Sequence, residues 1–176
     1  VSAEIPPIGA VAEPYALWAI QRDGMGEVFS HPSVKWVDDL VPYVRLKLHI
    51  LNLGHTVLTQ RWLLSRAPAD ETVRNTLADP AVAAHLNEIY TEEVIPGFAL
   101  YDMGDEAARY VAMTLDRFNN PFLEHRLADI AQNHAIKIQN RIGAFVAWVR
   151  ERQPDFTPRR LSAILASQNA EPERAI

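Results

Sequence analysis

Helix start and stop signals recur from residue 39 to residue 167 and restrict this part of the chain to a helical fold. Asp39 is a plausible N-cap with Pro42 in the following turn, and Asp79-Pro80 is a second clear start. Asp70 is expected to cap a short helix. The helix that starts at Asp79 is expected to end before Pro96. The predicted helices cover residues 39–65, 70–78, 79–94, 105–117, two helices within 121–152 with a bend near Asn133, and 158–167.

Residues 1–38 have a different pattern, with several prolines and glycines between two short β-prone runs. The runs Tyr15–Ile20 and Ser33–Val37 predict two strands. Because two strands make only a marginal sheet, we expect them to pack on the helical part or to complete a sheet formed elsewhere. The fold class is therefore mainly α, with a helical domain at 39–168, a strand-containing segment before it and a flexible tail at 169–176.

Composition narrows the functional classes. The 176 residues carry a net charge of −5, which argues against a general nucleic-acid binder. The chain has no cysteine, and no apolar run approaches the roughly 20 residues of a membrane span. None of its six histidines has the spacing of a metal motif, so we predict no metal site. The sequence predicts a cytoplasmic protein without nucleic-acid or membrane partners. Because it begins with Val1, we expect a fragment of a longer protein.

The segment Lys47–Thr56 places three polar side chains, Lys47, Asn52 and His55, in an otherwise apolar sequence. In an α-helix, Asn52 would lie roughly 140° and His55 roughly 80° around from Lys47, so the three share one broad face. A desolvated lysine works as a base near neutral pH, and an amide with an imidazole can hold an alcohol oxygen as it becomes a carbonyl. A solvated lysine and structural Asn and His residues are the alternative.

Two further cationic side chains are candidates for a cleft in front of this helix face. Arg117 precedes the helix break at Asn120-Pro121, where it either caps the helix or binds substrate oxygens. Lys137 lies between two isoleucines, and we expect it to be exposed rather than to reach the cleft, because lysine is rarely buried.

Four sequence segments, in order, resemble the mannitol dehydrogenase family of polyol-specific long-chain dehydrogenases, which includes fructuronate and tagaturonate reductases. They are Glu13-Pro14-Tyr15-x-x-Trp18, Pro42-Tyr43-x4-Lys47-x3-Leu51-Asn52-x-x-His55-Thr56, Arg117-Phe118-x-Asn120-Pro121, and Ile130-Ala131-x-Asn133-x3-Lys137-x3-Arg141. Many members have serine at the positions of Gly54 and Thr56. The Gly-His-Thr variant is closer to the uronate reductases.

The resemblance implies a two-domain enzyme, of which this chain is the helical C-terminal substrate domain, similar to that of 6-phosphogluconate dehydrogenase. Residues 1–38 would be the strand-rich tail of a missing Rossmann-like domain that binds NAD or NADP, with unknown cofactor contacts in this chain. Lys47 resembles the family's general acid/base, Asn52 the residue that binds the reacting oxygen, and His55 the residue that positions the substrate. Arg117, and more weakly His125 and Lys137, resemble substrate-binding residues.

The resemblance thus implies metal-independent interconversion of a sugar alcohol or aldonate with a ketose or ketouronate. The chain alone is expected to be inactive, because the cofactor domain is absent. The 6-phosphogluconate dehydrogenase family is a second possibility, although its Lys-x-x-His-Asn order differs from the order here. An alternative of another class is a non-catalytic helical interaction module on the same scaffold.

Overall fold

The computed structural model describes residues 17–22, 24 and 26–167. The chain divides into two compact units, residues 1–44 and residues 45–176, which are described separately below. The predicted tail at 169–176 and the Glu13-Pro14-Tyr15 part of the first motif lie outside the described residues.

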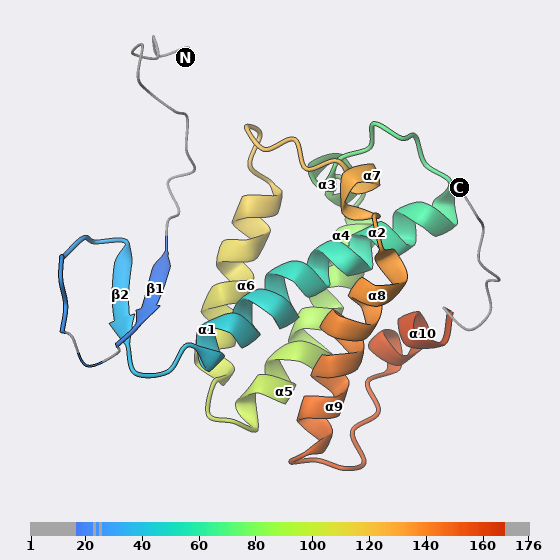
Figure 1. The fold of residues 1–176 in the computed structure, drawn as a ribbon. Helices are drawn as coiled ribbons and strands as arrows, with labels where there is room; N and C mark the ends of the chain where they lie inside the picture. Colours follow the sequence, from blue (N-terminus) through green and yellow to red (C-terminus); the bar gives the residue numbers. More distant parts are fainter. Residues whose placement is uncertain (1–16, 23, 25, 168–176) are drawn as a thin grey trace, which may run out of the picture. The chain divides into compact units, whose positions relative to one another are not determined.

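The first unit contains two short parallel strands, β1 (Trp18–Gln21) and β2 (Val34–Val37), with Trp18 opposite Val34 (Figure 1). The Phe29 ring lies between two tryptophans, 6.0 Å from Trp18 and 5.6 Å from Trp36. The Trp36 indole also donates a hydrogen bond to the Phe29 carbonyl, at 3.1 Å. Both predicted strands are present, although residues 15 and 16 of the first lie outside the described part.

A long helix carries the polar segment. It consists of α1 (Val41–Leu46), the π-helical turn η1 (Lys47–Asn52) and α2 (Leu53–Ser65), which follow one another without a break. The Asp39 carboxylate accepts the Val41 N–H at 2.8 Å, as predicted for a residue that caps this helix. The helix ends at Ser65, where Arg66 adopts a left-handed φ of 54°.

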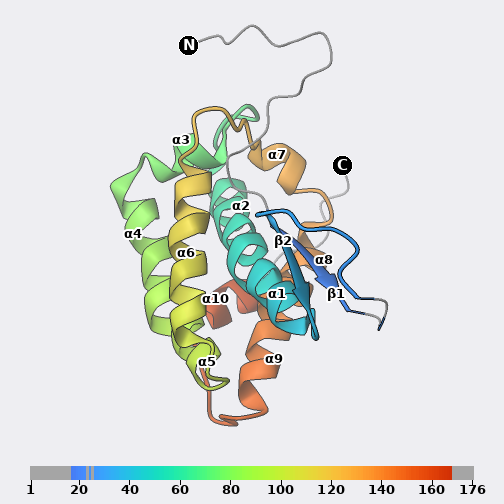
Figure 2. The same ribbon diagram turned by 90° about the vertical axis from the view of Figure 1, so that its left-hand side faces the viewer.

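Helix α2 lies among the other helices of the second unit (Figures 1 and 2). They are α3 (Val73–Leu77), α4 (Pro80–Glu88), η2 (Ile89–Val94), α5 (Ile95–Ala99), α6 (Gly104–Phe118), α7 (Leu127–Ile130), α8 (His134–Ile138), η3 (Gln139–Gly143), α9 (Ala144–Arg150) and α10 (Arg159–Ser167). Helix α2 packs against α3, α4, α7 and α8, while η1 packs against α6 and η3. The predicted mainly α fold with two short N-terminal strands is confirmed.

Two predicted helix boundaries are wrong. Thr72, rather than Asp70, caps α3, because its side-chain oxygen accepts the Asn75 N–H at 3.2 Å. Pro96 does not end the helix predicted at 79–94, because the helical stretch continues through η2 and α5 to Ala99. The π-helical turn η2 comes immediately before α5, so Pro96 stands in the first turn of a new α-helical segment, where its missing N–H is tolerated.

The predicted bend near Asn133 is present. Asn133 has φ 54° and separates α7 from α8. Asparagine adopts this left-handed conformation more readily than most residues do. None of the helices in the described part of the chain is both long and apolar enough to cross a membrane.

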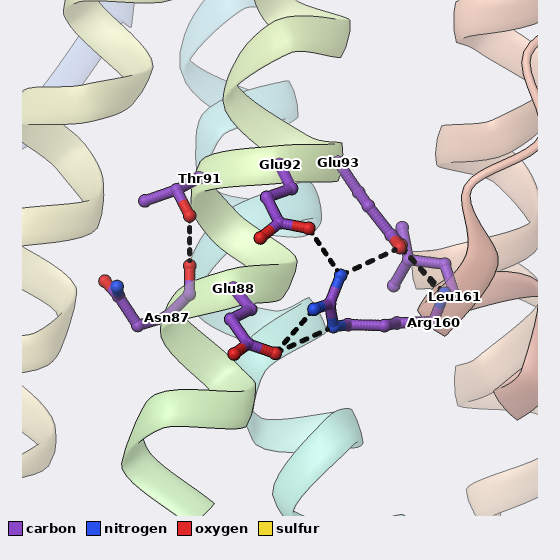
Figure 3. A network of polar contacts seen from close by, with 7 residues as sticks. All are labelled: Asn87, Glu88, Thr91, Glu92, Glu93, Arg160 and Leu161. Carbon is purple, nitrogen blue, oxygen red and sulfur yellow. Dashed lines mark hydrogen bonds and ion pairs between the residues drawn. The ribbon is translucent and has the colours of Figure 1, made fainter.

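Glu93 joins η2 to the first turn of α10 (Figure 3). It is only 5% exposed, and its two carboxylate oxygens accept the N–H groups of Arg160 at 2.7 Å and Leu161 at 2.9 Å. The Arg160 guanidinium bonds two further carboxylates of the same helical stretch, Glu88 at 2.5 Å and Glu92 at 2.7 Å. Glu93 therefore satisfies the free N–H groups of α10 from another helix, the role that a helix cap usually has.

Replacing Glu93 with glutamine should lower the free energy of unfolding by about 2 kcal/mol, because one buried N–H group then faces an amide NH2 group instead of a carboxylate oxygen. Urea denaturation of the chain measures this loss. Glu92→Gln is the matched control, and its effect should be much smaller because Glu92 is exposed. Equal losses in the two variants would contradict the capping role of Glu93.

Candidate functional site

The π-helical turn η1 sets the geometry of the candidate site. The Leu53 N–H reaches back five residues to the Leu48 carbonyl, which is the bond of a π-helix. Residues five apart then lie nearly one above the other, whereas an α-helix would separate Lys47 and Asn52 by roughly 140°. Lys47 and Asn52, the first and last residues of η1, therefore lie closer to one face than α-helical spacing predicts.

Lys47 itself is exposed on this chain. Within the described residues, no hydrogen bond joins its ammonium to Asn52 or His55. The described residues of this chain therefore leave the Lys47 side chain in contact with solvent. Asn52 is half-buried, and its backbone carbonyl accepts hydrogen bonds from the Thr56 hydroxyl at 2.9 Å and from Arg141 at 3.2 Å.

His55, in the first turn of α2, carries the clearest sign of a binding site. Its Nε2 atom is buried and has no hydrogen-bond partner among the described residues. Burial, reinforced by the charges of His125, Arg141 and Arg117, lowers the pKa of His55 to about 3. The ring is therefore neutral at physiological pH, and its buried nitrogen needs a partner.

Two of the predicted substrate-binding residues lie near this ring. Phe118, the last residue of α6, packs 4.6 Å from the His55 ring, and the charge of the preceding Arg117 acts on His55. The His125 ring lies 5.4 Å from His55 in an edge-on arrangement. The His125 carbonyl accepts the Val73 N–H at 2.9 Å, which fixes the loop after α6 against α3.

Lys137 is half-buried rather than exposed, contrary to prediction. Its ammonium donates a hydrogen bond to the Ile130 carbonyl at 2.8 Å, so the turn between α7 and α8 covers it. Burial, with the nearby charge of Arg141, lowers the pKa of Lys137. Isoleucines flank Lys137 in the sequence, and the next residue, Ile138, is buried, whereas Ile136 is exposed.

Arg141 is the residue that sequence reasoning left without a role. It lies in η3, and its guanidinium donates hydrogen bonds to the Asn52 carbonyl at 3.2 Å and to the Thr56 hydroxyl at 3.1 Å. The spacing Lys137-x3-Arg141 puts both residues near one helical face, a signal that was present in the sequence. The site thus combines a neutral imidazole with several cations, an arrangement suited to an anionic, hydroxyl-bearing ligand.

Among the described residues, no three His, Cys, Asp or Glu side chains come together as metal ligands would. The donors around His55 are imidazoles, an amide-bearing residue and cations. Their chemistry favours hydrogen bonds to hydroxyl and carboxylate oxygens.

Lowered histidine pKa values predict a pH dependence of stability. His55 has a pKa of about 3 and His134 has a pKa of about 4, and burial is the largest cause of both shifts. In the unfolded chain both pKa values are about 6.5. Below pH 6.5 the unfolded state therefore binds more protons than the folded state, so stability falls as pH falls.

The free energy of unfolding should decrease between pH 6.5 and 5, with His55 contributing about 1 kcal/mol per pH unit. Urea denaturation across this range measures the slope, and His55→Gln should flatten it. A slope that survives His55→Gln undiminished would contradict this assignment.

Comparison with known proteins relates this chain to a family of dehydrogenases. The family profile described as the mannitol dehydrogenase C-terminal domain matches residues 39–169. The altronate oxidoreductase of Yersinia enterocolitica is 34% identical over 134 residues, which are 76% of this chain and 27% of the relative. That of Pectobacterium carotovorum is 33% identical over 135 residues, 77% of this chain and 26% of the relative. That of Bacillus subtilis is 32% identical over 136 residues, 74% and 27% respectively. The chain spans little more than a quarter of the length of these curated relatives.

Proposed function

The chain belongs to the mannitol dehydrogenase family, and from this premise we propose that it is the substrate-binding and catalytic domain of a dehydrogenase that interconverts a secondary hydroxyl of an aldonate or sugar alcohol with the corresponding ketone. The observation that carries the proposal is the buried Nε2 atom of His55, which has no hydrogen-bond partner among the described residues. The His55 ring lies near His125, and the charge of Arg117 acts on it. A substrate hydroxyl is the partner that this nitrogen lacks.

In the proposed reaction, the amine of Lys47 accepts the proton of the substrate hydroxyl and returns it in the reverse direction. A nicotinamide would take the hydride that leaves the same carbon, and would give it back when the ketone is reduced. Asn52, one π-helical turn away, holds the reacting oxygen through its side-chain amide. Neutral His55 bonds a hydroxyl and orients the carbon chain. Arg117, with His125 and Lys137 as further contacts, binds oxygens away from the reacting carbon.

The described residues do not fit a nicotinamide dinucleotide. Gly24 and Gly26 have φ values of 91° and 80° and lie in the connection between β1 and β2, whose described residues contain no helix. Dinucleotide sites need a glycine-rich turn that leads from a strand into a helix. We therefore place NAD or NADP in a Rossmann-like domain outside this chain, to whose sheet residues 1–38 would contribute. That domain would also cover the exposed Lys47.

The relatives named altronate oxidoreductase favour an acidic substrate over an uncharged polyol, and the cations of the site agree with this choice. A guanidinium binds a carboxylate through two parallel hydrogen bonds, which an uncharged terminal CH2OH group does not offer. Altronate and related aldonates are therefore the proposed substrate class, with the corresponding ketouronates as products.

The test is a steady-state assay of a full-length dehydrogenase that carries this domain, with NAD and NADP supplied in turn. We expect kcat/KM for altronate to exceed that for an uncharged hexitol by at least about tenfold, the value of one charged hydrogen bond. The 176-residue chain alone should show no turnover. If the full-length enzyme turned over neither altronate nor the hexitol, the proposal would be overturned and a non-catalytic helical module favoured.

A further inference from the structure

Arg141 contacts η1 at two places through two different groups. Its guanidinium binds the last residue of η1, at the Asn52 carbonyl, together with the Thr56 hydroxyl. Its backbone carbonyl lies 3.0 Å from Nδ1 of His49, which stands in the middle of η1 and is 5% exposed. One residue of η3 thus fixes both the middle and the end of the turn that begins with Lys47.

A π-helical turn needs such support more than an α-helical turn does. The shift to five-residue hydrogen bonds disturbs the regular pairing of backbone carbonyls, and unpaired buried carbonyls are costly. Side chains of two neighbouring helices bind carbonyls of η1 from outside. The buried Tyr90 hydroxyl donates to the Ile50 carbonyl at 3.0 Å, and Arg141 donates to the Asn52 carbonyl. These two donors hold the wider turn in place.

The charge of Arg141 is unusual for this structural task. Its side chain is half-buried, and its two hydrogen-bond acceptors, a carbonyl and a hydroxyl, are neutral. Burial lowers the pKa of the Arg141 guanidinium. The planar guanidinium holds its N–H donors in a fixed fork, so one side chain can bind both acceptors in a single geometry. This rigidity accounts for an arginine in a supporting position.

We propose that Arg141 is a positioning residue that locks the π-helical turn and thereby sets the placement of Asn52 and Lys47 on one face. The proposal rests on the proposed function for its catalytic consequence, although the locking itself is a property of the chain. Arg141 acts through the Asn52 backbone.

The first measurement is amide hydrogen exchange of the full 176-residue chain. Arg141→Met removes the donors at similar side-chain length, Arg141→Lys keeps one charged donor, and Arg109→Met is the control at an exposed arginine of α6. With Arg141→Met, the amides of residues 50–56 should exchange about tenfold faster relative to those of α4, because a hydrogen bond from a charged group is lost. Arg141→Lys should restore most of the protection, and Arg109→Met should change nothing.

Thr56→Val tests the same contact without touching the arginine, and it serves where Arg141→Met does not fold. It removes one acceptor of Arg141, together with the hydroxyl's own bond to the Asn52 carbonyl, and should accelerate exchange in residues 50–56 by a smaller factor. Equal acceleration across all helices, or no change in residues 50–56, would overturn the proposal.

The second measurement separates this proposal from the proposed function. In a full-length dehydrogenase, Arg141→Met should lower kcat by at least about tenfold, with a smaller change in KM and partial rescue by Arg141→Lys. An unchanged kcat in an active enzyme overturns the positioning role. An inactive wild type overturns the proposed function. Faster exchange confined to residues 50–56 in Arg141→Met would still show that Arg141 stabilises the π-helical turn.

Discussion

Lys47→Met lowers kcat of a full-length dehydrogenase carrying this domain by at least about 100-fold, because general acid–base catalysis typically contributes 10²- to 10⁴-fold. Methionine keeps the length of the side chain and its apolar stem but has no amine to accept the substrate proton. In the proposed function, substrate binding depends mainly on His55 and the neighbouring cations, so KM should change far less. Steady-state kinetics measure both constants.

Lysines elsewhere in the chain provide the controls. Lys35→Met should leave kcat unchanged, since Lys35 is exposed in the first unit. Lys137→Met should raise KM more than it lowers kcat, as expected of a substrate contact. If Lys47→Met retained activity within a few-fold while Lys137→Met lost 100-fold, the base would be Lys137, whose ammonium is the half-buried one.

Gly54→Ala destabilises the chain by about 3 kcal/mol, the upper part of the usual range for overpacking a core. An added methyl group at Gly54 would meet the Tyr90 hydroxyl oxygen and would also lie 3.0 Å from the Phe118 ring. Tyr90 has no room to retreat, because it is fully buried and its hydroxyl is bonded to the Ile50 carbonyl. Urea denaturation of the chain measures the loss.

Tyr90→Phe shows whether this clash is the cause. Alone, it should cost about 1 kcal/mol, the value of a lost hydrogen bond to the Ile50 carbonyl. Combined with Gly54→Ala, it removes the atom that clashes, so the double variant should be more stable than the sum of the two losses predicts. Strict additivity would instead place the strain of Gly54→Ala elsewhere, with Phe118 as the next neighbour.

The helix boundaries that local side chains decide could be predicted from the sequence. Asp39 and Asp79 cap their helices through their own carboxylates, and Asn133 forms the predicted bend. The π-helical turns could not be predicted, because the bonds that support them come from residues distant in sequence, such as Tyr90. Pro96 was misread for the same reason, since its effect depends on the π-helical turn before it.

The candidate site shows the same division. The motif identified Lys47, Asn52 and His55 as residues of one helix, which the structure contains. It gave no role to Arg141, because the partner of that guanidinium is a backbone carbonyl, which every residue has. It also misjudged the burial of Lys137, which depends on the turn at Ile130. Gly54 and Thr56, which appeared in the sequence as departures from the commoner serines, contact Tyr90 and Arg141 respectively.

The π-helical character of Lys47–Asn52 means that the number of residues in this turn matters independently of their identity. A π-helical turn holds one more residue than the α-helical turn it replaces. Winding the same residues as an ordinary α-helix, without removing one, would rotate everything before the turn by about 100° relative to α2. Lys47 would then leave the face of His55, although every side chain of the motif would still be present.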